Sequence, residues 1–236
     1  MENPSNQTLG AFYASRCGRS VADQLSALID NRWKVPENLR FLTLGYATPF
    51  YSALKRKNPQ IIVEADPAEY PEDPSSLKVS PLSLPFPNDS FHAVLAVNAL
   101  ERILQPEALL KEIRRVLVNN GSLICITPNK FSLWGIKKIA PPMQNTLFSP
   151  KEATRLINES LLSVKYQKSA VFLPPAAYTH NVDILDEFMS YLPLSAGAFV
   201  LTEAKKQAAA ITLKCGEQNY KSARMTKASI FSSPRS

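Results

Sequence analysis

Residues 91–127 read FHAVLAVNALERILQPEALLKEIRRVLVNNGSLICIT, and this stretch decides the fold. Residues 91–97 are almost wholly apolar, which is typical of a strand covered on both faces of a parallel sheet. Residues 106–118 place their aliphatic side chains on one helical stripe, and the Asn-Asn-Gly that follows ends this helix. Residues 122–127 predict a second strand. Strand, helix and strand in this order indicate an α/β protein.

The chain before residue 91 repeats this alternation. Short apolar runs at 39–44 and 60–65 predict two strands. Thr48 and Pro49 are suited to begin the helix that joins them, which we expect at 48–57. Strands that alternate with helices of this size predict a mainly parallel sheet with helices on both faces, joined by right-handed crossovers.

Two further segments belong to the N-terminal half. Aliphatic residues recur at helical spacing over 20–33, which predicts an amphipathic helix behind a Ser20 cap. Residues 67–87 hold six prolines, which exclude a long helix. We expect this segment to be mostly loop, with a brief strand near 77–79.

Beyond residue 128 the pattern predicts four elements after one irregular stretch. The irregular stretch is at 131–148, and the four elements are a helix at 150–160 capped by Ser149, a strand at 163–173, a helix at 181–192 and a strand from 198. The late pair of strands indicates an antiparallel edge of the sheet.

Length and composition fit one domain. The chain has 236 residues, of which 45% are apolar, which suffices for one substantial core but not for two ordinary catalytic domains. We divide it into an N-terminal helical extension at 1–35, an α/β domain at 36–213 and a basic tail at 214–236 that we expect to be disordered. Within the domain, 131–148 and 174–196 are expected as insertions on the substrate side.

Charge, apolar runs and cysteines exclude several classes of protein. The net charge is +7, but residues 211–236 carry five basic side chains against one acidic, so the folded part is nearly balanced. Residues 211–236 could bind nucleic acid or an acidic partner, or could simply be solvated. Binding to nucleic acid is not favoured. No apolar run reaches the roughly 20 residues that cross a bilayer, and residues 1–10 lack a secretory signal. We expect no membrane association, a cytoplasmic location and, because three dispersed cysteines lack ligand spacing, no metal site.

Ligands of an open parallel sheet bind beyond the carboxyl ends of its strands. Here those ends are the loops after Leu44, Ala65, Val97 and Thr127. Residues 43–49 read TLGYATP, and Gly45 either serves a tight turn or allows backbone N–H groups to face a ligand. Asp66 lies 21 positions after Gly45, close to the spacing at which an acid holds a ribose hydroxyl, although a solvated loop acid explains it equally well.

Four motifs resemble those of one enzyme family. They are LPFPNDSFHAV at 84–94, NALER at 98–102, LLKEIRRVL at 109–117 and NGSL at 120–123. Together they resemble the methyltransferase type 11 family of class I S-adenosylmethionine-dependent methyltransferases, with its LPFPDxSFD strand, ALEH-like end and LLxEIxRVLxPGG helix. The similarity covers about residues 39–130. Residues 12–15, 44–49 and 128–134 are also similar to a bacterial branch of predicted methyltransferases.

The resemblance implies a Rossmann-like class I methyltransferase fold with a seven-stranded sheet, S-adenosylmethionine as the cofactor and an unidentified methyl acceptor. It also implies a set of cofactor contacts. Gly45, Tyr46 and Ala47 would pass under the methionine part, Asp66 would meet the ribose, Pro81 and Leu82 would flank the adenine, and Asn98, Ala99 and Leu100 would form the floor near the sulfonium.

Several positions depart from the family pattern. Thr43 and Ser80 stand where acidic residues are usual, Ala47 and Pro49 replace glycines, and His92 replaces an acid. Each change removes either a carboxylate that could accept a hydrogen bond or a glycine whose backbone a ligand could approach closely. Each lost hydrogen bond weakens cofactor binding by about 1 kcal/mol. A non-catalytic binding or regulatory protein on the same fold therefore stays open. A nicotinamide-dependent oxidoreductase is disfavoured because its three-glycine loop is missing.

Methyl transfer requires mainly that a nucleophile is aligned with an activated methyl group. Glu101 is the candidate for deprotonating the substrate, ahead of His92. Tyr13 is expected either to close over the cofactor or to pack as an aromatic. Substrate selection is assigned to residues 131–148 and 181–192, where aromatic and lysine side chains suit an anionic or aromatic acceptor, or form a solvated rim.

Overall fold

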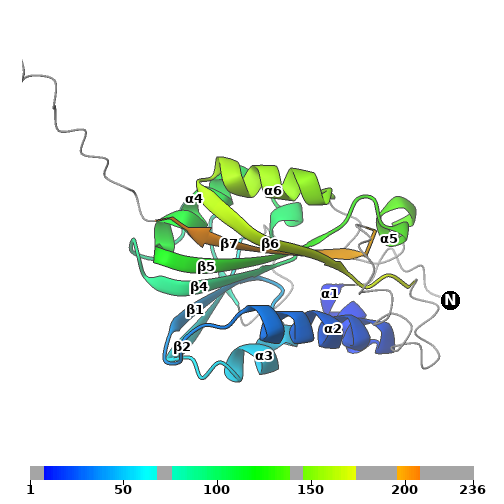
Figure 1. The fold of residues 1–236 in the computed structure, drawn as a ribbon, viewed down its shortest axis with the longest axis horizontal. Coiled ribbons are helices and arrows are strands. Elements are labelled where there is room, and N and C mark those ends of the chain that lie inside the picture. The colour runs from blue at the N-terminus through cyan, green and yellow to red at the C-terminus, as the bar shows by residue number, and fades with distance from the viewer. Residues whose placement is uncertain (1–7, 68–75, 139–145, 174–195, 208–236) are drawn as a thin grey trace, which may run out of the picture.

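The computed structural model describes residues 8–67, 76–138, 146–173 and 196–207 (Figure 1). The predicted helix at 181–192 and the predicted basic tail lie outside these residues. Within them, seven strands form one sheet in the order β3-β2-β1-β4-β5-β7-β6. The strands are β1 (Arg40–Gly45), β2 (Ile61–Asp66), β3 (Leu77–Lys78), β4 (Phe91–Val97), β5 (Leu117–Pro128), β6 (Leu162–Ala170) and β7 (Phe199–Lys206).

The pairing of the strands confirms the predicted sheet. Strands β1 to β5 pair in parallel, which requires a crossover between successive strands. Strand β7 runs antiparallel to both of its neighbours, β5 and β6. The sheet is therefore mainly parallel with an antiparallel edge.

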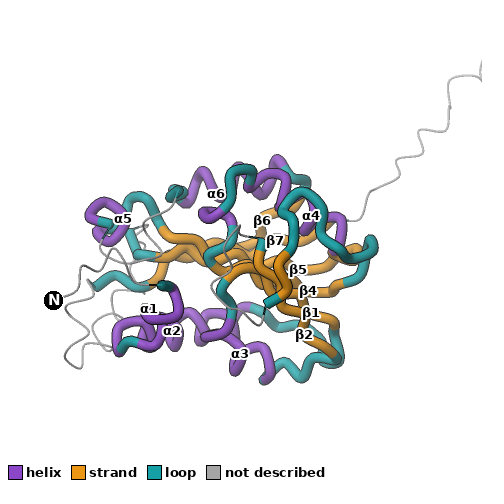
Figure 2. The backbone as a smooth tube through the Cα atoms, turned by 180° about the vertical axis from the view of Figure 1, so that it is seen from behind, coloured by secondary structure: helices purple, strands orange, loops and turns teal. Residues whose placement is uncertain are grey.

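Helices cover both faces of the sheet, which gives three layers (Figures 1 and 2). Helices α1 (Leu9–Ala14), α2 (Arg16–Arg32) and α3 (Tyr51–Lys55) lie on one face, and α4 (Pro106–Val116) and α6 (Pro150–Glu159) lie on the other. The short α5 (Leu133–Lys137) lies at the same end of the sheet as α1 in both views. The predicted Rossmann-like arrangement is confirmed.

Two apolar cores result from the alternation of side chains along each strand. In β1, Phe41 packs into the core beneath α1 to α3, whereas Leu42 and Leu44 pack into the core beneath α4 and α6. Helix α2 is tied to the sheet because the Trp33 indole Nε1–H donates to Ser122 Oγ at 2.7 Å. These buried strands explain why residues 91–97 carry apolar side chains on both faces.

The N-terminal helical segment differs from the prediction of one helix capped by Ser20. Helices α1 and α2 meet at Ser15, whose Oγ accepts the Gly18 N–H at 3.0 Å and so caps α2. A Cβ at Gly18 would lie 2.0 Å from the Phe12 carbonyl oxygen. The glycine thus allows α1 to fold back closely on α2, and the Ser20 cap is wrong.

Two other boundaries differ for reasons of sheet pairing and local geometry. Helix α4 ends at Val116 rather than Val118, because Leu117 is already extended and pairs with Phe91 in the sheet. The helix predicted at 48–57 is a 3-10 turn, Thr48–Phe50, followed by α3. The predicted helix at 150–160 is confirmed as α6, with Ser149 in a reciprocal capping box.

Candidate functional site

The candidate site lies where the carboxyl ends of β1, β2 and β4 meet. The register places Leu44 beside Ala65 and Gly45 beside Val97. Asp66 and Asn98 follow Ala65 and Val97 directly, so both lie next to the Gly45 turn. This is the edge of an open parallel sheet at which ligands bind.

Gly45 is required by the turn and by the neighbouring strand. Its φ of +78° lies in the left-handed region, and a Cβ there would be 2.2 Å from the Val97 carbonyl oxygen. The Tyr46 N–H donates to Val97 O at 3.0 Å, and the Ala47 N–H donates to Gly45 O at 3.1 Å. These two donors are therefore used within the protein, which favours the tight turn over the alternative in which they face a ligand.

A chain of buried hydrogen bonds connects α1 to the end of β4. The Tyr13 hydroxyl donates to Asn98 Oδ1 at 3.1 Å, and Asn98 Nδ2 donates to Glu101 Oε1 at 2.7 Å. Glu101 belongs to a 3-10 turn, Leu100–Arg102, that follows β4. Burial, and then the charge of Glu101, raise the pKa of Tyr13, so its hydroxyl stays protonated and donates.

The last member of this series of hydrogen bonds, Glu101, has a buried carboxyl group. The residue is only 3% exposed. Burial raises the pKa of Glu101 from its ordinary 4.5 to about 7, although the hydrogen bond from Asn98 acts in the opposite direction. The second carboxyl oxygen, Oε2, has no hydrogen-bond partner in the part of the chain that the structure describes. The geometry thus indicates that Glu101 fixes the position of Asn98 and does not contact a substrate directly.

Tyr13 also packs on the Gly45 turn through aromatic contacts. Its ring stacks on Tyr46 with centroids 5.7 Å apart and planes 17° apart, and it meets Phe50 edge to face at 6.0 Å. Gly10, one helical turn earlier, approaches the Tyr46 hydroxyl so closely that a Cβ would lie 3.2 Å from it. Tyr13 is thus an aromatic packing residue that covers the turn, and its closing over the cofactor stays a prediction.

Asp66 is not a solvated loop acid, since it is only 1% exposed. Its Oδ2 lies 3.0 Å from Arg102 Nη1, and both side chains are nearly buried. The pair joins the end of β2 to the turn after β4. The charge-assisted hydrogen bond from Arg102 fixes the orientation of the Asp66 carboxylate.

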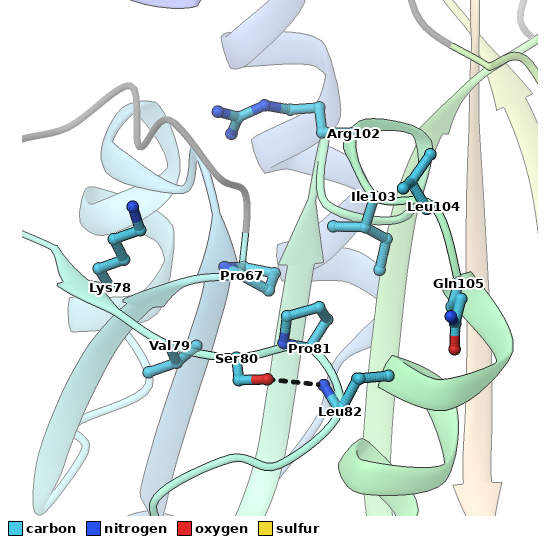
Figure 3. Close-up of a pocket in the computed structure, with 10 residues that line it drawn as sticks. All are labelled: Pro67, Lys78, Val79, Ser80, Pro81, Leu82, Arg102, Ile103, Leu104 and Gln105. Carbon is cyan, nitrogen blue, oxygen red and sulfur yellow. Dashed lines mark hydrogen bonds between the residues drawn. The ribbon is translucent and has the colours of Figure 1, made fainter.

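A pocket of about 520 Å³ opens beside this ion pair (Figure 3). Its walls come mainly from residues 78–82 at the end of β3 and residues 102–105 after β4, with Pro67 after β2 beside them. The lining residues are Pro67, Lys78, Val79, Ser80, Pro81, Leu82, Arg102, Ile103, Leu104 and Gln105. The Ser80 hydroxyl accepts the Leu82 N–H at 3.2 Å and so shapes the first wall. The walls are mostly apolar, with two cations at the rim.

The structure brings together some of the predicted site residues and separates others. Pro81 and Leu82 line the pocket, and Asp66 lies next to it. Ala99 packs against Gly45, while Leu100 is buried in the core beneath α4.

His92 is distant from these residues. It lies at the start of β4, a strand whose other end carries Asn98, so about 20 Å of strand separates the two. Its Nδ1 accepts the Arg40 N–H at 3.3 Å, and partial burial, then Arg40, lower its pKa. The prediction of His92 as a candidate base is wrong for geometric reasons.

The expected substrate side is only partly within the described residues. It contains a helix that the sequence did not reveal, α5, which Ser132 caps. Trp134 in this helix is buried and donates its indole N–H to Leu173 O at 2.7 Å. Phe131 and Ile136 are exposed. Lys130, which directly precedes this segment, lies 3.9 Å from Glu152 in an exposed ion pair.

Sequence reasoning missed one pocket wall. Arg102 and the residues Ile103 to Gln105 face Pro81 and Leu82 across the pocket. The available signal was Arg102 itself, which stands in the ALEH-like motif where the family has histidine. Its partner Asp66 is 36 positions away, and no local pattern links the two.

Comparison with known proteins finds a matching family model and similar sequences. A family model described as a methyltransferase domain matches residues 53–125, a range that includes Asp66, both predicted adenine contacts and Asn98. The chain is 26% identical to uncharacterized protein YafS of Escherichia coli over 159 residues, which is 66% of this chain and 65% of YafS. The chain spans less than two thirds of the length of the curated relatives that it matches.

Solved structures share the fold. An S-adenosylmethionine-dependent methyltransferase of Thermotoga maritima, described as a possible histamine N-methyltransferase, superposes with a TM-score of 0.56 at 23% identity, over 80% of this chain and 91% of that one. The [4+2]-cyclase SpnF superposes with a TM-score of 0.55 at 16% identity, over 78% of this chain and 81% of that one. None of the helices described is long and apolar enough to cross a membrane.

Proposed function

Because the chain belongs to the methyltransferase type 11 family, which its residues 53–125 match, we propose that it transfers a methyl group from S-adenosylmethionine to an acceptor. The adenosyl group would bind in the pocket between the segment after β3 and the loop after β4. The proposal names the cofactor and the type of reaction.

The pocket at the end of β2 is the observation that carries this proposal. Its volume of about 520 Å³ lies within the range of small-molecule sites. Val79, Pro81 and Leu82 on one side and Ile103 on the other give two apolar walls, between which a planar purine ring loses water on both faces. The residues present therefore fit the adenosyl part of the cofactor.

The Asp66–Arg102 pair supports the position of the ribose. The carboxylate lies at the end of β2, next to the pocket-lining Pro67, and accepts from Arg102 at 3.0 Å. A second lone pair on a fixed carboxylate oxygen can accept from a ribose hydroxyl without a further loss of side-chain freedom. Arg102 would thus orient the Asp66 carboxylate toward the ribose.

In the reaction, the bound sulfonium supplies an activated methyl group, and the chain supplies alignment. Asn98 is fixed at the floor by Tyr13 on one side and Glu101 on the other. Glu101 would act by positioning Asn98, because the carboxyl group is buried and its Oε1 is hydrogen-bonded to Asn98. The loss of a proton from the acceptor would then fall to the acceptor's own solvent contacts or to a group outside the described residues.

A titration calorimetry experiment with S-adenosylhomocysteine, the demethylated product, tests the proposal. Leu82→Arg places a long cation in the pocket wall and should weaken binding at least about tenfold. Ile61→Arg is the matched control. Ile61 is about as exposed as Leu82, but it lies at the start of β2, whereas the pocket lies at the other end of that strand. Absence of binding at millimolar ligand, or equal affinity in Leu82→Arg and wild type, would contradict the proposed site.

A further inference from the structure

The two halves of the candidate site differ in how they are covered. The half at the end of β2 opens into the pocket beside Arg102. The half at the Gly45 turn is covered by α1, which also reaches α5 because Phe12 meets Trp134 edge to face at 6.3 Å. Helix α1 therefore lies over the ends of β1, β4 and β5, the edge at which the rest of a bound cofactor would extend.

Tyr13 contacts both groups that the family resemblance assigns to the cofactor's methionine part and sulfonium. Its ring stacks on Tyr46 in the turn, and its hydroxyl donates to Asn98 in the floor. Tyr13 is only 5% exposed, so its ring and hydroxyl are packed inside the protein. The contacts that a ligand would make to Tyr46 and Asn98 are thus made by Tyr13.

The backbone of the turn is also fully engaged at these positions. The N–H groups of Tyr46 and Ala47 donate within the turn and to β4, and the Asn98 N–H donates to Ile126 O at 3.2 Å. Thr43, which stands where the family has an acid, directs its hydroxyl to Val63 O at 3.4 Å. An ammonium or carboxylate of an amino acid would therefore have to displace existing contacts in order to bind here.

From these contacts we infer that Tyr13 determines which part of an adenosyl ligand the site admits. With α1 in place, the site accepts adenosine-sized ligands, and a ligand that carries the methionine part binds only when Tyr13 leaves Tyr46 and Asn98. This inference rests on the proposed function, because it concerns the same cofactor site. Tyr13 is then a specificity-determining residue, and α1 is the element that moves.

Two ligands separate the two halves of the site in calorimetry. Adenosine fills the pocket alone, whereas S-adenosylhomocysteine also needs the half beneath α1. In Tyr13→Ala, the affinity for S-adenosylhomocysteine should rise about tenfold relative to adenosine, which corresponds to about 1.4 kcal/mol. Tyr13→Phe keeps the ring and loses only the hydroxyl, so its gain should be smaller. Tyr166→Ala on β6, at the far edge of the sheet, is the control and should leave both affinities unchanged.

Amide hydrogen exchange of the wild-type chain provides a test that does not depend on a folded variant. The N–H groups of Phe12 and Ser15 donate to Thr8 O and Phe12 O and report on α1. S-adenosylhomocysteine should speed exchange in residues 8–15, and adenosine should leave it unchanged.

The opposite results distinguish the possible failures. Slower exchange in α1 with S-adenosylhomocysteine, or weaker binding in Tyr13→Ala, would mean that Tyr13 holds the methionine part, which overturns the inference and leaves the proposed function intact. No binding of S-adenosylhomocysteine to wild type, Tyr13→Phe or Tyr13→Ala would overturn both. Binding to Tyr13→Ala but not to wild type would support the inference and overturn the proposed function of the wild-type chain.

Discussion

Replacing Glu101 by glutamine should remove a large part of the pH dependence of folding stability. The Glu101 carboxyl is buried, and burial raises its pKa from 4.5 to about 7. At about 1.4 kcal/mol for each pKa unit, a rise of this size corresponds to about 3 kcal/mol of unfolding free energy. Glutamine has nearly the same shape and still accepts from Asn98, so the variant should fold.

The sign follows from which state holds the proton. Below pH 4.5 the carboxyl is protonated in both the folded and the unfolded chain, and it contributes its full stability. As the pH rises from 4.5 towards 7, the unfolded chain loses the proton while the folded chain keeps it, so the wild type becomes less stable. Above the folded pKa the loss is complete. Glu101→Gln should therefore match the wild type near pH 4.5 and exceed it by about 3 kcal/mol near pH 8.

Urea unfolding at several pH values between about 4.5 and 8 measures this difference. Glu159→Gln is the control, because Glu159 lies at the exposed end of α6 in a surface pair with Arg155. Its curve should run parallel to that of the wild type. If the stability difference between Glu101→Gln and wild type stays the same at both ends of the range, the burial argument for Glu101 is refuted.

Three other substitutions test separate parts of the structure. Gly45→Ala should destabilise the chain by about 2–4 kcal/mol in urea unfolding, because of the positive φ and the contact with Val97 O, and a fully stable variant would contradict the turn geometry. Asp66→Asn leaves the nearly buried Arg102 without its carboxylate and should cost about 3 kcal/mol, whereas adding Arg102→Met should restore part of that loss, and strict additivity would speak against the pair. Ser149→Ala removes the cap of α6 and should cost about 1 kcal/mol, measured as a lower urea midpoint.

The strongly periodic elements were predictable from the sequence. The apolar run of β4 and the aliphatic stripe of α4 each determine one type of element, because few other structures bury such a pattern. Helix α5 was missed since five residues are too few to show a period, and only its Ser132 cap is visible in the sequence. The Ser15 cap was missed because the bend it forms depends on Gly18 approaching Phe12.

The candidate site was predictable in outline but not in its connections. Pro81 and Leu82, which the family resemblance assigns to the adenine, line the pocket, and Asp66 lies at the end of β2, while their contacts with a cofactor stay predictions. The link from Tyr13 to Asn98 joins residues 85 positions apart, and it forms only when α1 folds over the sheet. Contacts of this kind follow from tertiary packing, so the sequence could suggest Tyr13 as a cover but could not show what it contacts.

The most direct test of the account is a crystal structure of the chain with S-adenosylhomocysteine. We expect the adenine between Pro81, Leu82 and Ile103, and the ribose beside Asp66. The amino-acid part should lie where Tyr13 now meets Tyr46 and Asn98. An adenosyl group bound elsewhere, or a pocket that stays without ligand density at saturating concentration, would contradict it.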